Sequence, residues 1–177
     1  LLRNACNIDF TRYKHGTIQR RLSRRMALRQ ATSVADYVAM LESDPAETLA
    51  LGRDLLIQVT GFFRDPETFE VLTQTVFPRI AAGKESTGPL RIWVPGCATG
   101  EEVYSIAICL LEYLGERAAT MAVQIFGTDI SMEALESART GRYIENIARN
   151  VSPERLERFF VRDGEYYCVD KPVRELC

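Results

Sequence analysis

The feature that most constrains this sequence is segment 90–141, where short apolar runs alternate with amphipathic stretches. The run LRIWV at 90–94 is almost continuously apolar, which is typical of a strand buried on both faces. The small-residue stretch GCATG at 96–100 follows, and residues 102–115 then carry apolar side chains at helical spacing. The run AVQIFGTD at 122–129 predicts a second strand, and Ser131 can cap a helix that Gly141 ends. This β-α-β-α order predicts parallel strands in an open α/β sheet.

The residues before this segment predict only helices, followed by a polar, glycine-rich stretch, GKESTGP, at 83–89. Helices are expected at 17–30, after the cap residue Ser33, at 46–59 and after Asp65-Pro66, with Pro78 ending or kinking the last one. A short helix is expected from Ser152 to Phe160, and the tail predicts two short strands around residues 170–172. The expected organisation is a helical domain at 1–82, a linker at 83–89 and an α/β domain at 90–177.

Charge is unevenly distributed along the 177 residues, whose formal net charge is −2. Residues 1–30 hold eight Lys and Arg against one acid, whereas the remaining residues sum to −9. The predicted helix 17–30 has an apolar stripe of Ile18, Leu22 and Met26, and its other faces carry Arg20, Arg21, Arg24 and Arg25. Such a helix can dock an acidic helical partner or nucleic acid, and the same pattern is also typical of a solvated face. Aromatic residues are not interleaved with these arginines, so stacking on bases is not supported.

Several functional classes are disfavoured by composition. A single histidine and five cysteines without C-x-x-C spacing argue against a metal site and against Ser–His or Cys–His catalysis. No apolar run reaches the roughly 18 residues of a membrane span, and there is no signal-peptide pattern. We therefore expect a cytoplasmic protein with free thiols, without membrane insertion.

The turn at 96–102 predicts the ligand site, because ligands of open α/β sheets lie beyond the carboxyl ends of the strands. Gly96 and Gly100 allow positive φ or a close approach of the backbone, and Asp129 ends the second strand, where a carboxylate can bind ribose hydroxyls. The G-x-G-x-x-G spacing of dinucleotide sites is absent, and Glu101 and Glu102 would repel a pyrophosphate. A nucleoside cation such as S-adenosylmethionine (SAM) fits better. The two glutamates are also typical of plain helix N-terminal capping.

Three ordered motifs together resemble the CheR family of chemotaxis methyltransferases: TGFFRDPETF, RIWVPGCATGEEVYSIA and IFGTDISMEALESARTGRY. The stretch RYKHGTIQRRLSRRMAL is similar to the family's N-terminal helical domain in the form seen in CheB–CheR hybrid proteins. The resemblance implies an all-α domain followed by a Rossmann-like SAM-dependent methyltransferase domain. It also implies methylation of glutamate side chains on chemoreceptors, with γ-glutamyl methyl esters and S-adenosylhomocysteine (SAH) as products.

The resemblance further implies which residues form the site. The cofactor-binding residues would be Gln58, Thr60, Phe62, Arg64, Gly96, Cys97, Gly100, Glu102, Asp129 and Ile130. Family members often have asparagine where this chain has Gln58. Arg64 is the candidate catalytic residue, since its guanidinium suits the methionine carboxylate of SAM. A glutamate substrate is already a nucleophile near neutral pH, so positioning supplies most of the catalysis and no general base is needed.

The resemblance also implies a binding partner and a longer parent protein. Arg20, Arg21, Arg24 and Arg25 would dock the acidic cytoplasmic helical bundle of a chemoreceptor, which would recruit the protein to receptor arrays. The family continues with a third strand and with Asn-Leu-Leu and C-R-N-V-x-I-Y-F motifs, which this sequence lacks. We therefore expect a piece of a longer protein that is inactive alone and self-associates, either by pairing through an unpaired strand edge at Ile92 and Val94 or by burying the exposed face. The alternative function is a non-catalytic SAM-sensing or interaction module of a signalling hybrid.

Overall fold

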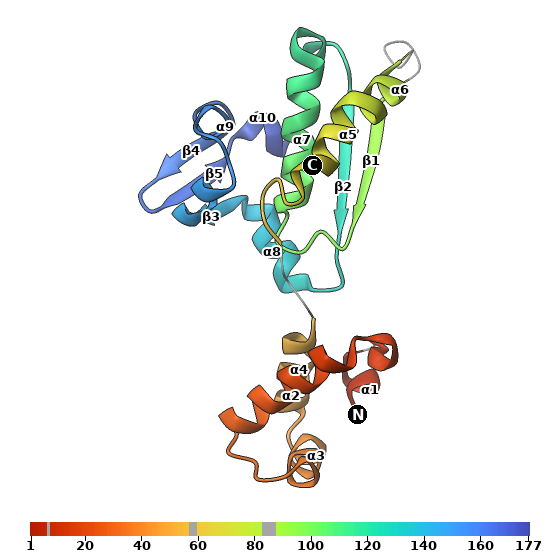
Figure 1. The fold of residues 1–177 in the computed structure, drawn as a ribbon, viewed down its shortest axis with the longest axis vertical. Helices are drawn as coiled ribbons and strands as arrows, with labels where there is room; N and C mark the ends of the chain where they lie inside the picture. The colour runs from red at the N-terminus through yellow and green to blue at the C-terminus, as the bar shows by residue number, and fades with distance from the viewer. Residues whose placement is uncertain (7, 57–59, 83–87) are drawn as a thin grey trace. The chain divides into compact units, whose positions relative to one another are not determined.

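The chain divides into two compact units, Leu1–Ile57 and Gln58–Cys177 (Figure 1). The computed structural model describes residues 1–6, 8–56, 60–82 and 88–177. The predicted end of the helical domain at residue 82 therefore lies inside the second unit. The reason is a shared core, because Phe69, Leu72, Phe77 and Ala81 pack into the apolar cluster of the α/β region.

The first unit is a small helical cluster. Its elements are α1 Leu2–Cys6, the 3₁₀ turn η1 Phe10–Arg12, α2 His15–Leu28, α3 Val34–Ser43 and α4 Pro45–Leu55. The predicted stripe of Ile18, Leu22 and Met26 on α2 packs against its buried core, so the helical periodicity is confirmed. Ser33 caps α3 as predicted. α4 begins earlier than expected because the Asp44 carboxylate accepts from two N–H groups of its first turn. The predicted end of α4 at residues 57–59 lies outside the described residues.

The second unit opens with a helical segment that passes through a proline. It consists of α5 Pro66–Val71, the π-helical turn η2 Leu72–Val76 and α6 Phe77–Ala81. Of the two predicted effects of Pro78, the helical segment does not end there; the regular α-helix is instead interrupted just before it by the π turn, in which the Phe77 N–H donates to Leu72 O. Asp65 precedes α5, but its φ is +57° and its side chain makes no cap hydrogen bond, so that predicted cap is wrong.

The predicted β-α-β-α order is confirmed. β1 Leu90–Pro95 and β2 Val123–Thr128 form a parallel pair, and they are joined through α7 Glu101–Leu114 and η4 Gly115–Ala119; α8 Met132–Thr140 follows β2 (Figure 1). Alternate strand residues, including Val94 and Ile125, are buried in the core that α7 shares. The opposite face carries Trp93 and Phe126, which are register partners and are 68% and 50% exposed. Among the described strands, β1 pairs only with β2, so its other edge is unpaired as predicted, although the side chain of Val94 is buried.

A small antiparallel sheet follows. Its elements are β3 Arg142–Ile144, η5 Glu145–Arg149, α9 Pro153–Phe159, β4 Phe160–Asp163, β5 Tyr166–Val169 and α10 Lys171–Arg174, with strand order β3-β5-β4. Of the two strands predicted around residues 170–172, the first is confirmed as β5, whereas the second is wrong because that segment forms α10; β5 instead pairs with β4 in a hairpin that turns at Gly164, where φ is +60°. The Asp170 carboxylate instead caps α10. Beyond α10, Leu176 O accepts from the Ile125 N–H at 2.6 Å, which ties the tail to β2.

Candidate functional site

The turn between β1 and α7 has an unusual backbone. Gly96, Ala98 and Gly100 all have positive φ, at +70°, +46° and +94°. Glycine adopts these values without strain, so the predicted role of the two glycines is confirmed, whereas Ala98 is strained. Gly100 has a second reason to lack a side chain, because a Cβ there would lie 2.8 Å from the Cβ of Ala138 on α8. A Cβ on Gly96 would meet nothing within 4 Å, so this end of the turn faces open space.

The Asp129 carboxylate, at the end of β2, is hydrogen-bonded to the turn that follows β1. Its Oδ2 accepts from the Ala98 N–H at 2.9 Å, and its Oδ1 accepts from the Ser131 N–H at 2.8 Å. A carboxylate offers about four acceptor positions, so these two bonds fix its orientation and leave others for a ligand. The structure therefore brings the predicted ribose-binding carboxylate and the glycine turn together.

Two further carboxylates follow on the first turn of α7. Glu101 Oε2 accepts from the Thr99 hydroxyl at 2.7 Å, whereas the exposed Glu102 makes no hydrogen bond or ion pair within the described part of the chain. Their effect is visible at the Cys97 thiol, whose pKa is raised first by burial and then by the charges of Asp129, Glu102 and Glu101. The turn thus carries a negative potential, which favours a cationic ligand.

The TGFFR motif is anchored to α7. The Phe63 N–H donates to Ser105 Oγ at 3.0 Å, and the Ser105 hydroxyl donates to Glu101 O at 2.6 Å. Phe63 packs under the Arg155 guanidinium, 4.0 Å from its ring centroid, and belongs to the core. The motif therefore lies beside the glycine turn, as the sequence led us to expect.

Two predicted cofactor-binding residues are buried and make contacts within the protein. Phe62 is buried, with the rings of Tyr143 and Phe160 at 4.8 and 5.4 Å, so its side chain belongs to an aromatic core. Cys97 is also buried, its N–H donates to Thr128 O and its carbonyl accepts from the Gly100 N–H. Both residues therefore have internal contacts, Cys97 also lines the pocket beside the glycine turn, and their contact with a cofactor stays a prediction.

The remaining predicted cofactor-binding residues differ in their exposure to solvent. Arg64 is 59% exposed, with Nε 3.9 Å from Asp65 Oδ2, and Ile130 is exposed directly after Asp129. Thr60 is half-buried at the start of its motif. Gln58 lies outside the described residues.

Tyr143 was not predicted from sequence as a site residue. It lies on β3, is buried, and its hydroxyl donates to Thr99 O in the glycine turn at 2.7 Å. The only local signal is an aromatic residue in the motif GRY, directly after the helix-ending Gly141 and Arg142. This local pattern does not indicate that the Tyr143 hydroxyl bonds to Thr99, which lies 44 positions earlier in the chain.

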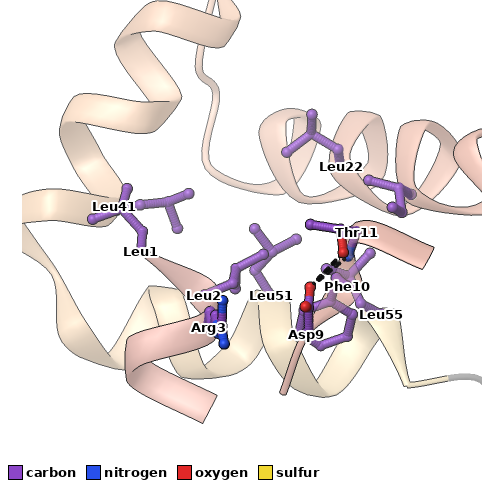
Figure 2. A pocket seen from close by; sticks show the side chains of 11 residues that line it. Leu1, Leu2, Arg3, Asp9, Phe10, Thr11, Leu22, Leu41, Leu51 and Leu55 are labelled. Carbon is purple, nitrogen blue, oxygen red and sulfur yellow. Dashed lines mark hydrogen bonds between the residues drawn. The ribbon is translucent and has the colours of Figure 1, made fainter. Parts of the chain in front are cut away.

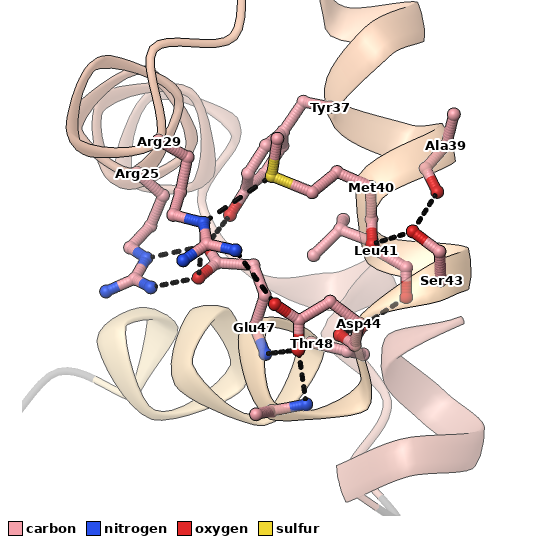
Figure 3. Close-up of polar contacts among 11 residues, drawn as sticks. Arg25, Arg29, Tyr37, Ala39, Met40, Leu41, Ser43, Asp44, Glu47 and Thr48 are labelled. Carbon is pink, nitrogen blue, oxygen red and sulfur yellow. Dashed lines mark hydrogen bonds and ion pairs between the residues drawn. The ribbon is translucent and has the colours of Figure 1, made fainter.

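Two arginines of the basic helix α2 region, Arg25 and Arg29, are paired with carboxylates inside the first unit (Figure 3). Arg25 donates from Nε and from its terminal nitrogen to Glu47, which is 3% exposed, and also pairs with Asp54 at 3.7 Å. Arg25 is therefore part of the fold of the first unit, and its predicted docking role needs correction. Arg20 and Arg24 are exposed, and Arg21 is half-buried with its Nε buried and lacking a hydrogen-bond partner.

Two pockets in the described residues differ in their position relative to the glycine turn and in their lining. The larger, about 500 Å³, lies in the first unit and is lined mainly by leucines; its polar residues are Arg3, Asp9 and Thr11, and the last two are hydrogen-bonded to each other (Figure 2). The smaller, about 280 Å³, adjoins the glycine turn through Cys97 and Gly100 but does not include Asp129 or Glu102. We place the candidate site at the turn because its charges and backbone geometry specify a ligand, whereas the leucine-lined pocket offers few polar groups.

Within the described ranges, no group of three or more His, Cys, Asp or Glu side chains could hold a metal ion. No helix in the same ranges is both long and apolar enough to cross a bilayer.

The chain is similar to known proteins over most of its length. It is 37% identical over 168 residues to "Uncharacterized 104.1 kDa protein in hypE 3'region" of Rhodobacter capsulatus, covering 95% of this chain and 18% of that protein. It is 35% identical to the chemotaxis protein methyltransferase of Klebsiella aerogenes and 32% identical to that of Escherichia coli, covering 92% of this chain in each case. The matches cover 53% and 54% of those two proteins, so the chain spans about half their length.

Two family models account for the two units. Residues 1–56 match the CheR methyltransferase all-alpha domain, and residues 58–177 match the CheR methyltransferase SAM binding domain. The boundary between the matches coincides with the boundary between the compact units. This chain therefore belongs to the CheR methyltransferase family.

Proposed function

We propose that this protein takes part in the SAM-dependent methylation of glutamate side chains on chemoreceptors. The observation that carries the proposal is the Asp129 carboxylate, which two backbone N–H groups orient at the joined ends of two parallel strands. The domain that contains it matches a SAM binding domain, and relatives are named chemotaxis protein methyltransferases. A non-catalytic sensing module is not favoured by these relatives.

The residues of the turn suit SAM as cofactor. The free acceptor positions of Asp129 are at the place where ribose hydroxyls bind in open α/β sheets. The open space beside Gly96 leaves room for a ligand near the backbone. The carboxylates of Glu101 and Glu102 favour the amine and sulfonium of SAM, and they would repel a pyrophosphate.

The roles of the chain's own residues follow from this arrangement. SAM supplies an electrophilic methyl group when bound, and a substrate carboxylate is nucleophilic near neutral pH. We propose that Asp129 binds the ribose, that Glu102 lies near the positive end of the cofactor and that Arg64 binds the methionine carboxylate. The site is completed by Thr60, Gly96, Gly100 and Ile130. These residues hold the cofactor in one orientation, and positioning of this kind can lower a barrier by several kcal/mol.

The first prediction concerns Asp129. In Asp129→Asn the side chain keeps its shape but loses its charge and part of its accepting capacity. Losing a hydrogen bond to a charged group costs roughly 1.5–3 kcal/mol, so the affinity for SAH should fall about tenfold to a hundredfold. Isothermal titration of SAH into the 177-residue chain measures this change.

Asp170→Asn is the matched control, since the Asp170 carboxylate also accepts from a backbone N–H but caps α10. We expect a similar loss of stability in urea for both variants and a loss of SAH affinity only for Asp129→Asn. Equal SAH binding by wild type and Asp129→Asn would refute the assignment of Asp129. Absence of SAH binding by the wild type would refute the proposed cofactor function.

We also propose that the exposed arginines of α2 dock the substrate. Arg20 and Arg24 are one helical turn apart, and both side chains are exposed, so they present two positive charges on one face. The acidic cytoplasmic helical bundle of a chemoreceptor is complementary to such a face. Arg25 is left out because Glu47 neutralises it.

A further inference from the structure

The ring of Tyr143 is a meeting point of three segments that are far apart in the sequence. Its hydroxyl bonds to Thr99 O of the glycine turn, 44 positions away. Phe62 of the TGFFR motif contacts the ring edge-on at 4.8 Å and 83°, and Tyr104 of α7 lies at 6.3 Å. These contacts hold the ring from several sides, which fixes the direction in which the hydroxyl points.

The Tyr143 hydrogen bond holds one end of a peptide group whose other end is also held. Thr99 O accepts from Tyr143, and the N–H of the same peptide, on Gly100, donates to Cys97 O at 2.9 Å. The peptide between Thr99 and Gly100 is therefore fixed in orientation. Burial raises the pKa of Tyr143, so the phenol remains a donor at neutral pH.

The glycine turn in turn positions Asp129. The Ala98 N–H belongs to the Cys97–Ala98 peptide, which one further peptide separates from the fixed one, and it donates to Asp129 Oδ2 at 2.9 Å; Ala98 adopts a strained φ of +46°. A residue in this conformation persists only when its surroundings hold it there. Without the Tyr143 hydroxyl, the turn can relax, and the Ala98 N–H can move away from Asp129.

We propose that Tyr143 is a positioning residue for the cofactor site, which couples the small antiparallel sheet to the turn that orients Asp129. The inference rests on the proposed function, because it takes the turn and Asp129 as the place where SAM binds. It assigns to β3 a role in cofactor affinity although β3 does not belong to the parallel sheet.

The chain offers a matched control in Tyr104. Its hydroxyl donates to Ala138 O at the same distance of 2.7 Å, but Ala138 lies near the end of α8 and outside the turn. Tyr143→Phe and Tyr104→Phe therefore each remove one hydroxyl from a buried ring and leave one backbone carbonyl without this donor. A purely structural role predicts the same behaviour for both variants.

Titration of SAH into the full chain is the first measurement. We expect Tyr143→Phe to weaken SAH binding about tenfold and Tyr104→Phe to change it less than about twofold, with similar shifts in the urea midpoint. Amide hydrogen exchange without ligand is the second measurement, and the exchange of the Ala98 N–H should accelerate in Tyr143→Phe only.

The outcomes separate this inference from the proposed function. Wild-type SAH affinity in Tyr143→Phe, or equal losses in both variants, overturns the positioning role. If the wild type binds no SAH, the proposed cofactor function fails, and the exchange of Ala98 still decides whether Tyr143 holds the turn. Unchanged exchange of Ala98 in Tyr143→Phe overturns the inference by itself.

Discussion

Glu47 accepts hydrogen bonds from Arg25 and from the Tyr37 hydroxyl, and Arg29 Nε lies 3.5 Å from its Oε2 (Figure 3). The pKa of Glu47 is raised by burial, but the hydrogen bonds from Arg25 and Tyr37 outweigh this and leave it below its ordinary value of 4.5. A buried ion pair is weak evidence for net stability, yet removing one partner leaves the other charge uncompensated. The structure therefore predicts the cost of removing one partner of the ion pair, and not the net contribution of the pair to stability.

We predict that Glu47→Gln destabilises the first unit by about 3 kcal/mol, because Arg25 then loses its hydrogen-bonded carboxylate and keeps only Asp54, at 3.7 Å, as an ion-pair partner. Since the folded-state pKa is lowered, the contribution of Glu47 is fully present above about pH 4.5 and is lost as the pH falls toward that lowered value. The difference in unfolding free energy between wild type and Glu47→Gln should therefore shrink as the pH falls below this value. Urea denaturation followed by circular dichroism measures it.

Glu42→Gln is the control for this prediction, since Glu42 is an exposed carboxylate on the neighbouring α3. It should change stability by less than about 0.5 kcal/mol and leave the pH dependence unaltered. A Glu47→Gln variant as stable as Glu42→Gln would show that the network contributes nothing, and Arg25 would again be available for docking.

Among the elements, α2 illustrates how one helix serves two purposes. Its apolar stripe and Arg25 face the core of the first unit, whereas Arg20 and Arg24 face solvent. Helical periodicity predicted the stripe, because an amphipathic helix places every third or fourth residue on one face. It could not separate Arg24 from Arg25, since only the packing of α4 brings Glu47 to the second of them.

We predict that the double charge reversal Arg20→Glu, Arg24→Glu weakens binding to a purified chemoreceptor cytoplasmic fragment at least tenfold, chiefly through slower association. Added salt should weaken the wild type in the same direction, because it screens exposed charges over about 10 Å at 0.1 M. Surface plasmon resonance at several salt concentrations measures both effects.

Arg53→Glu, Arg79→Glu is the matched control, since it makes the same change of net charge at exposed arginines on α4 and α6. It should reduce receptor binding much less, and neither double variant should alter SAH affinity. Equal losses in both variants would mean that only the net charge matters, and α2 would not be a specific docking element.

At the scale of the whole molecule, the parallel sheet has one uncovered face within the described residues. Parallel sheets are normally covered on both faces, and here Trp93 and Phe126 lie side by side in register on the exposed one. We propose that the 177-residue chain self-associates at micromolar concentration through this face. The sequence predicted self-association either by edge pairing at Ile92 and Val94 or by burial of an exposed face, and the exposed side chains of Trp93 and Phe126 favour the second route.

Trp93 is the only tryptophan, so its fluorescence reports directly on this face. We expect its emission to shift to the blue as concentration rises, in parallel with a larger sedimentation coefficient. Phe126→Lys should weaken self-association about tenfold or more, because a buried phenylalanine contributes roughly 1.5–3 kcal/mol. Val161→Lys, at an exposed apolar site on β4, is the control. A concentration-independent monomer would contradict the prediction.

The sequence by itself determined the order of the elements, the two glycines with positive φ and the placement of Asp129 at a strand end. Each of these depends on local patterns, namely the period of apolar residues, turn chemistry and the position of a polar residue after a strand. The family motifs then indicated SAM as the cofactor, which the match to a SAM binding domain supports.

Only the tertiary structure decided which groups are already occupied by internal partners. It packed Phe62 into an aromatic core, buried Cys97, paired Arg25 with Glu47 and placed helices α5 and α6 in the second unit. It also brought Tyr143 to Thr99. These outcomes depend on contacts between residues distant along the chain, and the free energy of such contacts depends on burial and geometry that no local pattern encodes.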